Sequence, residues 1–319
     1  MMESNGPWLQ VYTIDEPYVK LDCGLGEAPF WEQSTNTLRF VDIIKQRVHV
    51  VQLDQGPSSH KILAELDVSI GTTADIEGNE DHFVFGGKHG YGFFHRKTGA
   101  YKYIHKYWTD DEVASGKEKL YRGNDGAIDS EGRFWVGTMN DPLVKAPTPT
   151  GTLFRLDPDG TLHRILEGVH IPNGISWSKD NRTMYFTDSP TKTIWAYDFD
   201  AATGNMSNKR PFFTVQEENG LPDGHALDEE GYMWCAVHGI GKVFRISPQG
   251  KLVAEIRVPT RCPTCPGFAG EDLYITSAAE EEPEKFPEST KLHGSLFKVH
   301  VGVKGVRPNR FKWAGDVAV

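Results

Sequence analysis

Three pairs, each made of an oxygen-bearing residue and a glycine, are the features of this sequence that point most directly to chemistry. They are Asp125-Gly126, Asn173-Gly174 and Asp223-Gly224, and they recur at intervals of about 50 residues. Asp-Gly and Asn-Gly pairs are typical of tight turns. If the three predicted turns lie at the same end of one channel, their oxygen atoms surround a common point. This arrangement predicts a shared metal ion.

Two further side chains extend this oxygen set. Glu27 directly follows Gly26 in an earlier unit of the same pattern, and Asn124 precedes Asp125. Together with Asn173 and Asp223 they supply only oxygen ligands, which suits Ca²⁺, Mg²⁺ or Mn²⁺. Zn²⁺ is an alternative because it also accepts carboxylates, although no His or Cys cluster favours it. The competing interpretation of each pair, taken alone, is ordinary turn chemistry without a metal.

The repeat also predicts the elements that must position these side chains. Each unit contains a glycine, a short apolar strand, a polar turn and a further strand, without an amphipathic helix of about ten or more residues. Six glycines open such units: Gly26, Gly71, Gly126, Gly174, Gly224 and Gly267. We therefore predict an all-β fold, a six-bladed β-propeller, as a single domain over residues 1–319. Residues 1–20 are expected to form a lead-in and closing strand.

Composition limits the classes of function. The net charge of −10 argues against nucleic acid, which requires a basic surface. No stretch approaches the roughly 20 apolar residues of a membrane span, and no secretory signal is visible, so a cytoplasmic location without membrane attachment is expected. The four cysteines are too few for a disulfide scaffold. Propellers leave few exposed edges, which favours a monomer or dimer.

The ordered motifs resemble those of the SMP-30/gluconolactonase family, the regucalcin-like lactonases. The matching stretches include Gly26-Glu-Ala-Pro-Phe-Trp31, Asn124-Asp-Gly126, Asn173-Gly174 with Trp177-Ser178, Pro222-Asp-Gly224 with Trp234, and Gly294-Ser-Leu-Phe297. The resemblance implies a six-bladed propeller with one divalent metal held by Glu27, Asn173 and Asp223. It also implies that Asn124 lies near metal and substrate, and that Arg122 contacts substrate hydroxyls.

The resemblance further implies hydrolysis of a sugar lactone, and the predicted side chains suit that reaction. A bound cation polarises a carbonyl and lowers the pKa of water, and Asp223 is the natural general base. At the position where animal members carry an acidic residue that reaches the substrate, this chain has Pro142, so the adjacent Asp141 is expected to replace it. His225 follows Asp223 closely and is expected to shape substrate choice.

Two other functions remain open from the sequence. The first is a metal-dependent hydrolase of organophosphates or non-sugar lactones, and the second is a calcium-binding propeller without catalysis. Cys262 and Cys265 form a C-x-x-C pair, which we expect to pack or to line the channel mouth because no second pair supports a zinc site. The glycine-rich stretch 86–92 is interpreted as a hairpin, and residues 107–121 as a surface loop.

Overall fold

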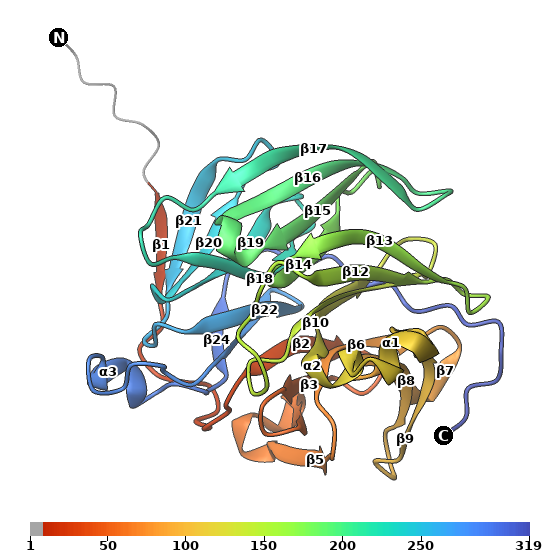
Figure 1. The fold of residues 1–319 in the computed structure, drawn as a ribbon. Coiled ribbons are helices and arrows are strands. Elements are labelled where there is room, and N and C mark those ends of the chain that lie inside the picture. The colour runs from red at the N-terminus through yellow and green to blue at the C-terminus, as the bar shows by residue number, and fades with distance from the viewer. Residues whose placement is uncertain (1–8) are drawn as a thin grey trace.

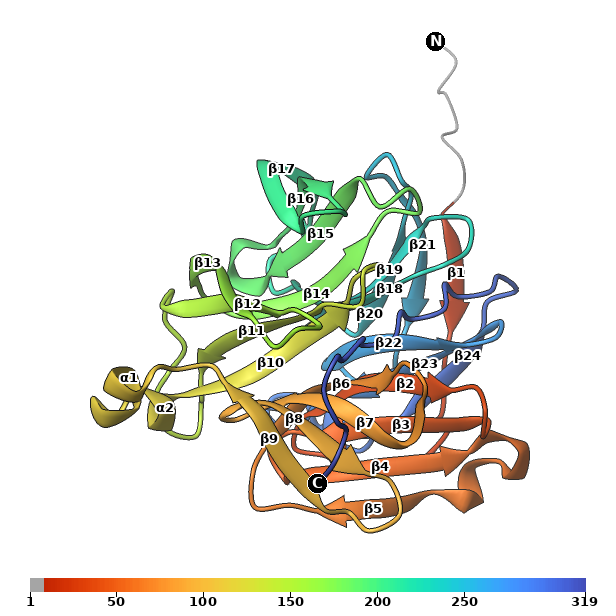
Figure 2. The ribbon, with the colours of Figure 1, turned by 90° about the vertical axis from the view of Figure 1, so that its right-hand side faces the viewer.

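The computed structural model describes residues 9–319, so the first eight residues of the predicted lead-in lie outside the described part of the chain. Six sheets follow one another around a central channel in the order of the sequence (Figure 1, Figure 2). Each innermost strand contacts the innermost strand of the next sheet, and the last contacts the first. The prediction of a six-bladed β-propeller is therefore confirmed.

The blades are antiparallel sheets whose innermost strand comes first in the sequence. The strands of blades one to three are β2 (Gly26–Glu32), β3 (Thr37–Asp42), β4 (Arg47–Gln52), β5 (Lys61–Glu65), β6 (Ile70–Ile76), β7 (Asn79–Gly87), β8 (Gly90–His95), β9 (Tyr101–Lys106), β10 (Tyr121–Ile128), β11 (Phe134–Asn140), β12 (Gly151–Leu156) and β13 (Leu162–Val169). Those of blades four to six are β14 (Pro172–Trp177), β15 (Thr183–Asp188), β16 (Thr193–Asp200), β17 (Asn205–Thr214), β18 (Leu221–Leu227), β19 (Met233–His238), β20 (Lys242–Ile246), β21 (Leu252–Arg257), β22 (Pro263–Ala269), β23 (Asp272–Ser277) and β24 (Phe297–His300).

Ring closure differs in detail from the prediction. The strand expected at the start of the chain exists as β1 (Gln10–Thr13), but it pairs in parallel with β21 at the outer edge of the fifth blade. The sixth blade is completed instead by Val19, whose backbone exchanges two hydrogen bonds of 3.0 Å with Leu296. Pairing of the two ends of the chain in one sheet removes a free edge, which stabilises the closed ring.

The core lies between neighbouring blades because each sheet packs its faces against the next. Trp135 of blade three and Trp177 of blade four share one buried cluster, with ring centroids 6.0 Å apart. A repeated Asp–Trp pair links the two inner strands of a blade. Trp135 Nε1 on β11 donates to Asp129 Oδ2 after β10 at 2.9 Å, and Trp234 Nε1 on β19 donates to Asp228 Oδ2 after β18 at the same distance. Both aspartates are fully buried.

The prediction of turns at the repeated glycines is wrong, because these residues lie inside the innermost strands. The strand register shifts at each position, so that an extra residue on the inner strand faces the channel. The glycines are needed for close packing between blades: a Cβ on Gly174 would lie 2.1 Å from Nδ1 of His225, and one on Gly224 would lie 2.5 Å from Sγ of Cys265. Asn-Gly and Asp-Gly suit such bulges as well as turns.

Short helices replace part of the loop predicted for residues 107–121. They are α1 (Asp110–Ala114) and α2 (Lys117–Leu120), and Thr109 with Glu112 forms a capping box that starts α1. A third helix, α3 (Pro287–Thr290), and three 3₁₀ turns (Leu53–Gln55, Pro57–Ser59 and Ser189–Thr191) lie in connections. Among residues 9–319, no helix has the length and apolar character that crossing a membrane requires.

Candidate active site

The predicted metal ligands, together with Arg122 and Asn124, come from four innermost strands and meet in the channel. Glu27 lies on β2, Asn173 on β14 and Asp223 on β18, while β10 supplies Arg122, Asn124 and Asp125. The charges of Asp223 and Asp125 both act on Glu27, and the side chains of Asn124 and Asn173 are hydrogen-bonded at 3.1 Å. Side chains that are distant in the sequence are thus brought to one region.

The strand bulges explain how these side chains reach the channel. In β10, Asn124 and Asp125 together oppose a single residue of β11. Their side chains therefore do not follow the usual alternation between the two faces of the sheet. In β18, Asp223 and Gly224 stand in the same relation to β19. In β2, Ala28 lies in the corresponding bulge and has a φ of +50°. This is a left-handed conformation that an alanine adopts only under strain.

A chain of hydrogen bonds fixes the amides of the site. Nη1 of Arg122 donates to Oδ1 of Asn124 at 2.6 Å, which turns the Asn124 amino group toward Oδ1 of Asn173. Nδ2 of Asn173 donates at 2.8 Å to Oγ of Ser189, a buried residue behind the channel. The carbonyl oxygen of Asn173 therefore lies on the side of Asn124, and it keeps a second lone pair, which a metal ligand needs.

Three carboxyl groups share the channel. Burial raises the pKa of Glu27, and the charges of Asp223 and Asp125 raise it further. Burial and then Asp125 raise the pKa of Asp223 in the same way. Burial also raises the pKa of Asp125 to about 6, although the N–H groups of Gly126 and Gly174 oppose the shift. Each carboxyl group is thus costly to ionise unless a cation lies nearby.

Arg122 is the cationic side chain in contact with this group, and it does not balance three carboxylates. Burial lowers its own pKa to about 10, against the charges of Asp141, Glu27 and Asp223. The ionised set therefore carries an excess of two negative charges, which one divalent cation would neutralise. An all-oxygen donor set with an amide carbonyl fits a hard cation such as Ca²⁺. The residues present therefore fit a divalent metal.

Two cavities lie toward opposite ends of the channel, and Asp125 is the one of the three carboxylates that lines either of them. The smaller, of about 140 Å³, is lined by Arg122, Asp141 and Lys88. The larger, of about 620 Å³, is lined by Asp125, Ser176 and His225 and by residues 306–309 of the C-terminal tail. Because Arg122 precedes Asp125 along β10, the innermost strands run from the smaller cavity to the larger one.

This division separates the predicted substrate-binding residues. Arg122, Asn124 and Asp141 lie at or near the smaller cavity, but His225 lies at the far end. His225 is packed against Gly174, its Nε2 is 2.7 Å from Oγ of Ser176, and burial lowers its pKa to about 3, so its ring is neutral. The structure therefore does not bring His225 together with Arg122 and Asp141.

Sequence reasoning missed two residues of the site. Lys88 forms an ion pair with Asp141 at the smaller cavity, and it lies at the tip of the β7–β8 hairpin in the glycine-rich stretch interpreted as a hairpin. That hairpin is confirmed, but its position at the channel mouth depends on the ring. Ser189 lies in a stretch, Asp188-Ser189, that also resembles the family, but the sequence assigned it no role, because it follows β15 and reaches Asn173 only through the pairing of β14 with β15.

The cysteine pair behaves as expected. Cys262 and Cys265 are buried at the start of the sixth blade, and none of the four cysteines forms a disulfide within residues 9–319. Cys265 packs against Gly224 and near Glu27, and burial raises the pKa of its thiol. A protonated thiol in this position fills space beside the carboxylates.

Comparisons with known proteins show which proteins this chain resembles. The family model described as SMP-30/gluconolactonase/LRE-like region matches residues 25–279. Regucalcin of Xenopus laevis is 32% identical, with 92% of this chain and 98% of that protein aligned. A Bacillus subtilis protein named for sugar lactone lactonase activity, YvrE, is 31% identical over 92% of this chain and 96% of its own length. The solved structure of Agrobacterium tumefaciens regucalcin, called a calcium-binding protein, has a TM-score of 0.85 at 24% identity and covers 95% of this chain and 99% of that one. This last likeness shows the fold.

Proposed function

Because this chain belongs to the SMP-30/gluconolactonase/LRE-like family, we propose that it is a metal-dependent lactonase that hydrolyses a sugar aldonolactone to the aldonic acid. The observation that carries the proposal is the group of carboxylates in the channel, Glu27, Asp125 and Asp223, with Arg122 as their cationic neighbour. A similar protein named as a sugar lactone lactonase supports the substrate class.

Glu27, Asn173 and Asp223 would hold one divalent cation, with Ca²⁺ the best match to the donors and Zn²⁺, Mg²⁺ or Mn²⁺ as alternatives. When bound, such a cation supplies Lewis acidity toward a lactone carbonyl and toward water. Asn124 fixes the carbonyl oxygen of Asn173 on its own side through a 3.1 Å hydrogen bond.

Asp223 acts as the general base. It takes a proton from the water whose oxygen bonds to the lactone carbonyl carbon. The ring C–O bond then breaks, and the ring oxygen leaves as a hydroxyl group after it receives that proton. Burial and Asp125 raise the pKa of Asp223 and so strengthen it as a base, although a bound cation opposes that shift. The carboxylic acid product ionises at neutral pH, so turnover releases acid.

The substrate enters from the smaller cavity, where Arg122 and the Lys88–Asp141 pair lie. Nε of Arg122 is buried without a hydrogen-bond partner among the described residues, so it is free to donate to a lactone or hydroxyl oxygen. Lys88 and Asp141 offer a donor and an acceptor to further hydroxyl groups. These contacts orient the lactone rather than activate it.

The test is a panel of aldonolactones, followed by proton release with a pH indicator. Asp223→Asn should lower kcat by about 10²- to 10⁴-fold while the circular dichroism spectrum is unchanged. Asp111→Asn, a matched change of an exposed aspartate on α1, should leave the rate unaltered. Chelation should abolish turnover, and the cation that restores it identifies the metal. Full activity of Asp223→Asn, or of exhaustively chelated protein, would refute the mechanism.

A second candidate function is calcium binding without catalysis, because the all-oxygen donor set of the channel is also the one that non-catalytic calcium sites use. Tight Ca²⁺ binding that depends on Glu27 and Asp223, with no proton release across the lactone panel, would select it. Hydrolysis of organophosphates or non-sugar lactones in place of aldonolactones would assign the same site to another substrate class.

A further inference from the structure

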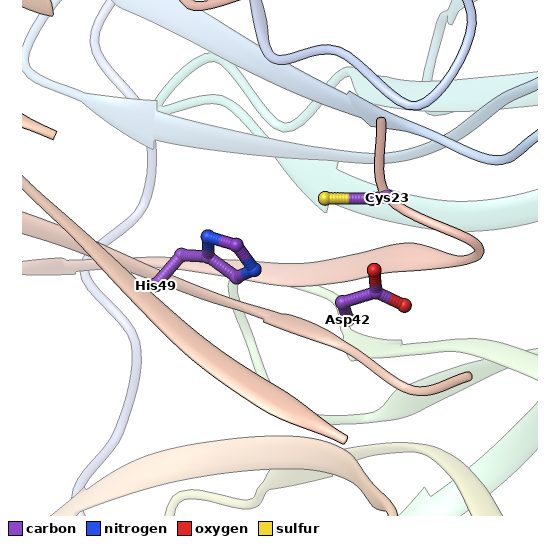
Figure 3. A group of neighbouring side chains, drawn as sticks. All are labelled: Cys23, Asp42 and His49. Atoms are coloured by element: carbon purple, nitrogen blue, oxygen red, sulfur yellow. The ribbon is translucent and has the colours of Figure 1, made fainter. Parts of the chain in front are cut away.

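A second group of donors lies away from the channel, at the seam where the ring closes. Cys23 precedes β2, Asp42 ends β3 and His49 lies on β4, and Figure 3 shows the three side chains around a common space. One ligand atom from each lies within 4.8 Å of the others, and among residues 9–319 this is the single such group of three Cys, His or acidic side chains. All three are buried.

His49 gives the group its most telling feature. Its ring is 4% exposed, and Nε2 has no hydrogen-bond partner within the described chain. Nδ1 lies 2.9 Å from Nε2 of His60, and in the tautomer in which Nδ1 donates, Nε2 carries a bare lone pair. A histidine that binds a metal through one ring nitrogen usually donates a hydrogen bond from the other nitrogen to a neighbouring acceptor. Burial lowers the pKa of His49 to about 4, which keeps the ring neutral, as a ligand must be.

Asp42 is held in place and still has a free lone pair. Its Oδ1 accepts from the N–H groups of Leu25, Ile44 and Lys45, while Oδ2 accepts from that of Gly24 alone, at 2.9 Å. Since each carboxylate oxygen offers about two lone pairs, Oδ2 retains capacity for one more contact. The four backbone bonds fix the carboxylate before any ligand arrives.

The chemistry of the donors selects the type of ion. Thiolate, imidazole and carboxylate together suit Zn²⁺, whereas Ca²⁺ and Mg²⁺ take oxygen ligands. Bonds of about 2.0 to 2.3 Å in a tetrahedral site place ligand atoms about 3.5 Å apart, so the three donor atoms need to close by roughly 1 Å, and the fourth position is left to water. The ion would displace the thiol proton of Cys23, and Zn²⁺ with one thiolate and one carboxylate is formally neutral, which favours burial.

We propose that Cys23, Asp42 and His49 form a structural zinc site, separate from the channel, that fastens the ring closure. Cys23 N donates to Gly294 O of the sixth blade at 3.0 Å, whereas Asp42 and His49 belong to the first blade. An ion bound by the three would therefore tie the segment that links the last blade to the first. This role does not depend on lactonase activity.

The test uses the full-length protein, stripped of metal and titrated with Co²⁺. Wild type should show a sulfur-to-cobalt charge-transfer band in the near ultraviolet, which Cys23→Ser abolishes and His49→Gln weakens. The band should persist in Cys265→Ser, a matched change of a buried cysteine beside the channel, and in Asp223→Asn, which removes a proposed channel ligand. A band lost in Cys265→Ser but kept in Cys23→Ser, or no band at saturating Co²⁺, would overturn the proposal.

Wild-type protein provides a measurement that does not depend on variants folding. X-ray absorption of the zinc-loaded wild-type protein should show a sulfur shell at about 2.3 Å from zinc. Zinc should also raise the Tm of Asp223→Asn, a gain that Cys23→Ser in the same background removes. A spectrum with only nitrogen and oxygen neighbours, or a Tm that zinc leaves unchanged in Asp223→Asn, would contradict the site.

Discussion

Nη1 of Arg122 donates to Oδ1 of Asn124 at 2.6 Å, and this bond sets the orientation of the side-chain amides of Asn124 and Asn173. Since Asn124 uses its oxygen for Arg122, its amino group faces Asn173, and Asn173 in turn directs its own amino group to Ser189. The residue proposed to bind substrate is thereby connected to a residue proposed to bind metal.

Arg122→Lys should weaken substrate binding more than it slows the chemical step. Lysine keeps the charge but loses the planar set of donors, so the bond to Asn124 and the donor at Nε are not both replaced. A lost hydrogen bond to a charged group costs about 1.5–3 kcal/mol, so KM should rise about 10- to 100-fold. Steady-state kinetics measure this. Arg210→Lys, at an exposed pair with Asp198, is the control, and an unchanged KM for Arg122→Lys would contradict the assignment.

Ser189→Ala should lower metal affinity although Ser189 is not a proposed ligand. The substitution leaves Nδ2 of Asn173 buried without its 2.8 Å partner, so the amide is free to turn away from the channel. Loss of such a supporting partner typically costs 10- to 100-fold in affinity. Isothermal titration with Ca²⁺ measures the effect. Ser178→Ala, at a surface turn of the same blade, should bind as wild type does; equal affinity of both variants would exclude the supporting role.

Lys88 and Asp141 should act on substrate as one unit. Their side chains are 19% and 8% exposed, so removing one partner leaves the other poorly solvated at the channel mouth. In a double-mutant cycle of Lys88→Gln and Asp141→Asn, the coupling in kcat/KM should be about 1–3 kcal/mol. The exposed Lys291–Glu288 pair provides the reference cycle, in which coupling should be close to zero. Additive effects at Lys88 and Asp141 would show that they do not cooperate.

Asp228→Ala should strongly destabilise the fold without removing any residue of the proposed active site. Asp228 is fully buried and accepts hydrogen bonds from Trp234 Nε1 and from Arg245. Removal of the carboxylate leaves Trp234 Nε1 without its acceptor and leaves Arg245 with Glu230 as its remaining partner, at a cost of about 3–5 kcal/mol in the free energy of unfolding. Urea denaturation measures it. Asp198→Ala, which breaks an exposed pair, should cost less than about 1 kcal/mol; equal losses would contradict the ranking.

Glu112 should contribute stability that acid removes. Burial opposes its ionisation, but hydrogen bonds from Arg164 and Lys117 outweigh burial and lower its pKa to about 2 from 4.5. A carboxyl group with a lowered folded pKa stabilises fully above its unfolded pKa, and that share is lost as pH falls from 4.5 toward 2. Glu112→Gln should therefore flatten the loss of Tm over this range. The exposed Glu167→Gln should leave the wild-type slope, and a wild-type slope in Glu112→Gln would refute the link.

The sequence by itself determined the number of blades and the inner residues of each. Gly26, Gly71, Gly126, Gly174, Gly224 and Gly267 all lie on innermost strands, because a repeat of sequence must build a repeat of structure. It also singled out the oxygen-bearing residues before Gly126, Gly174 and Gly224, since bulges and turns draw on the same local chemistry. For that reason the pattern could not distinguish the two, and the predicted turns are strand bulges.

Only the tertiary structure decided which residues share an end of the channel. Lys88 and Asp141 are 53 positions apart yet form an ion pair at one mouth, whereas His225, two residues from Asp223, lies toward the other. Ring closure, through Val19 and Leu296, likewise joins opposite ends of the chain. These relations depend on where the circle of blades closes and on the direction of each strand along the axis, which no local sequence pattern encodes.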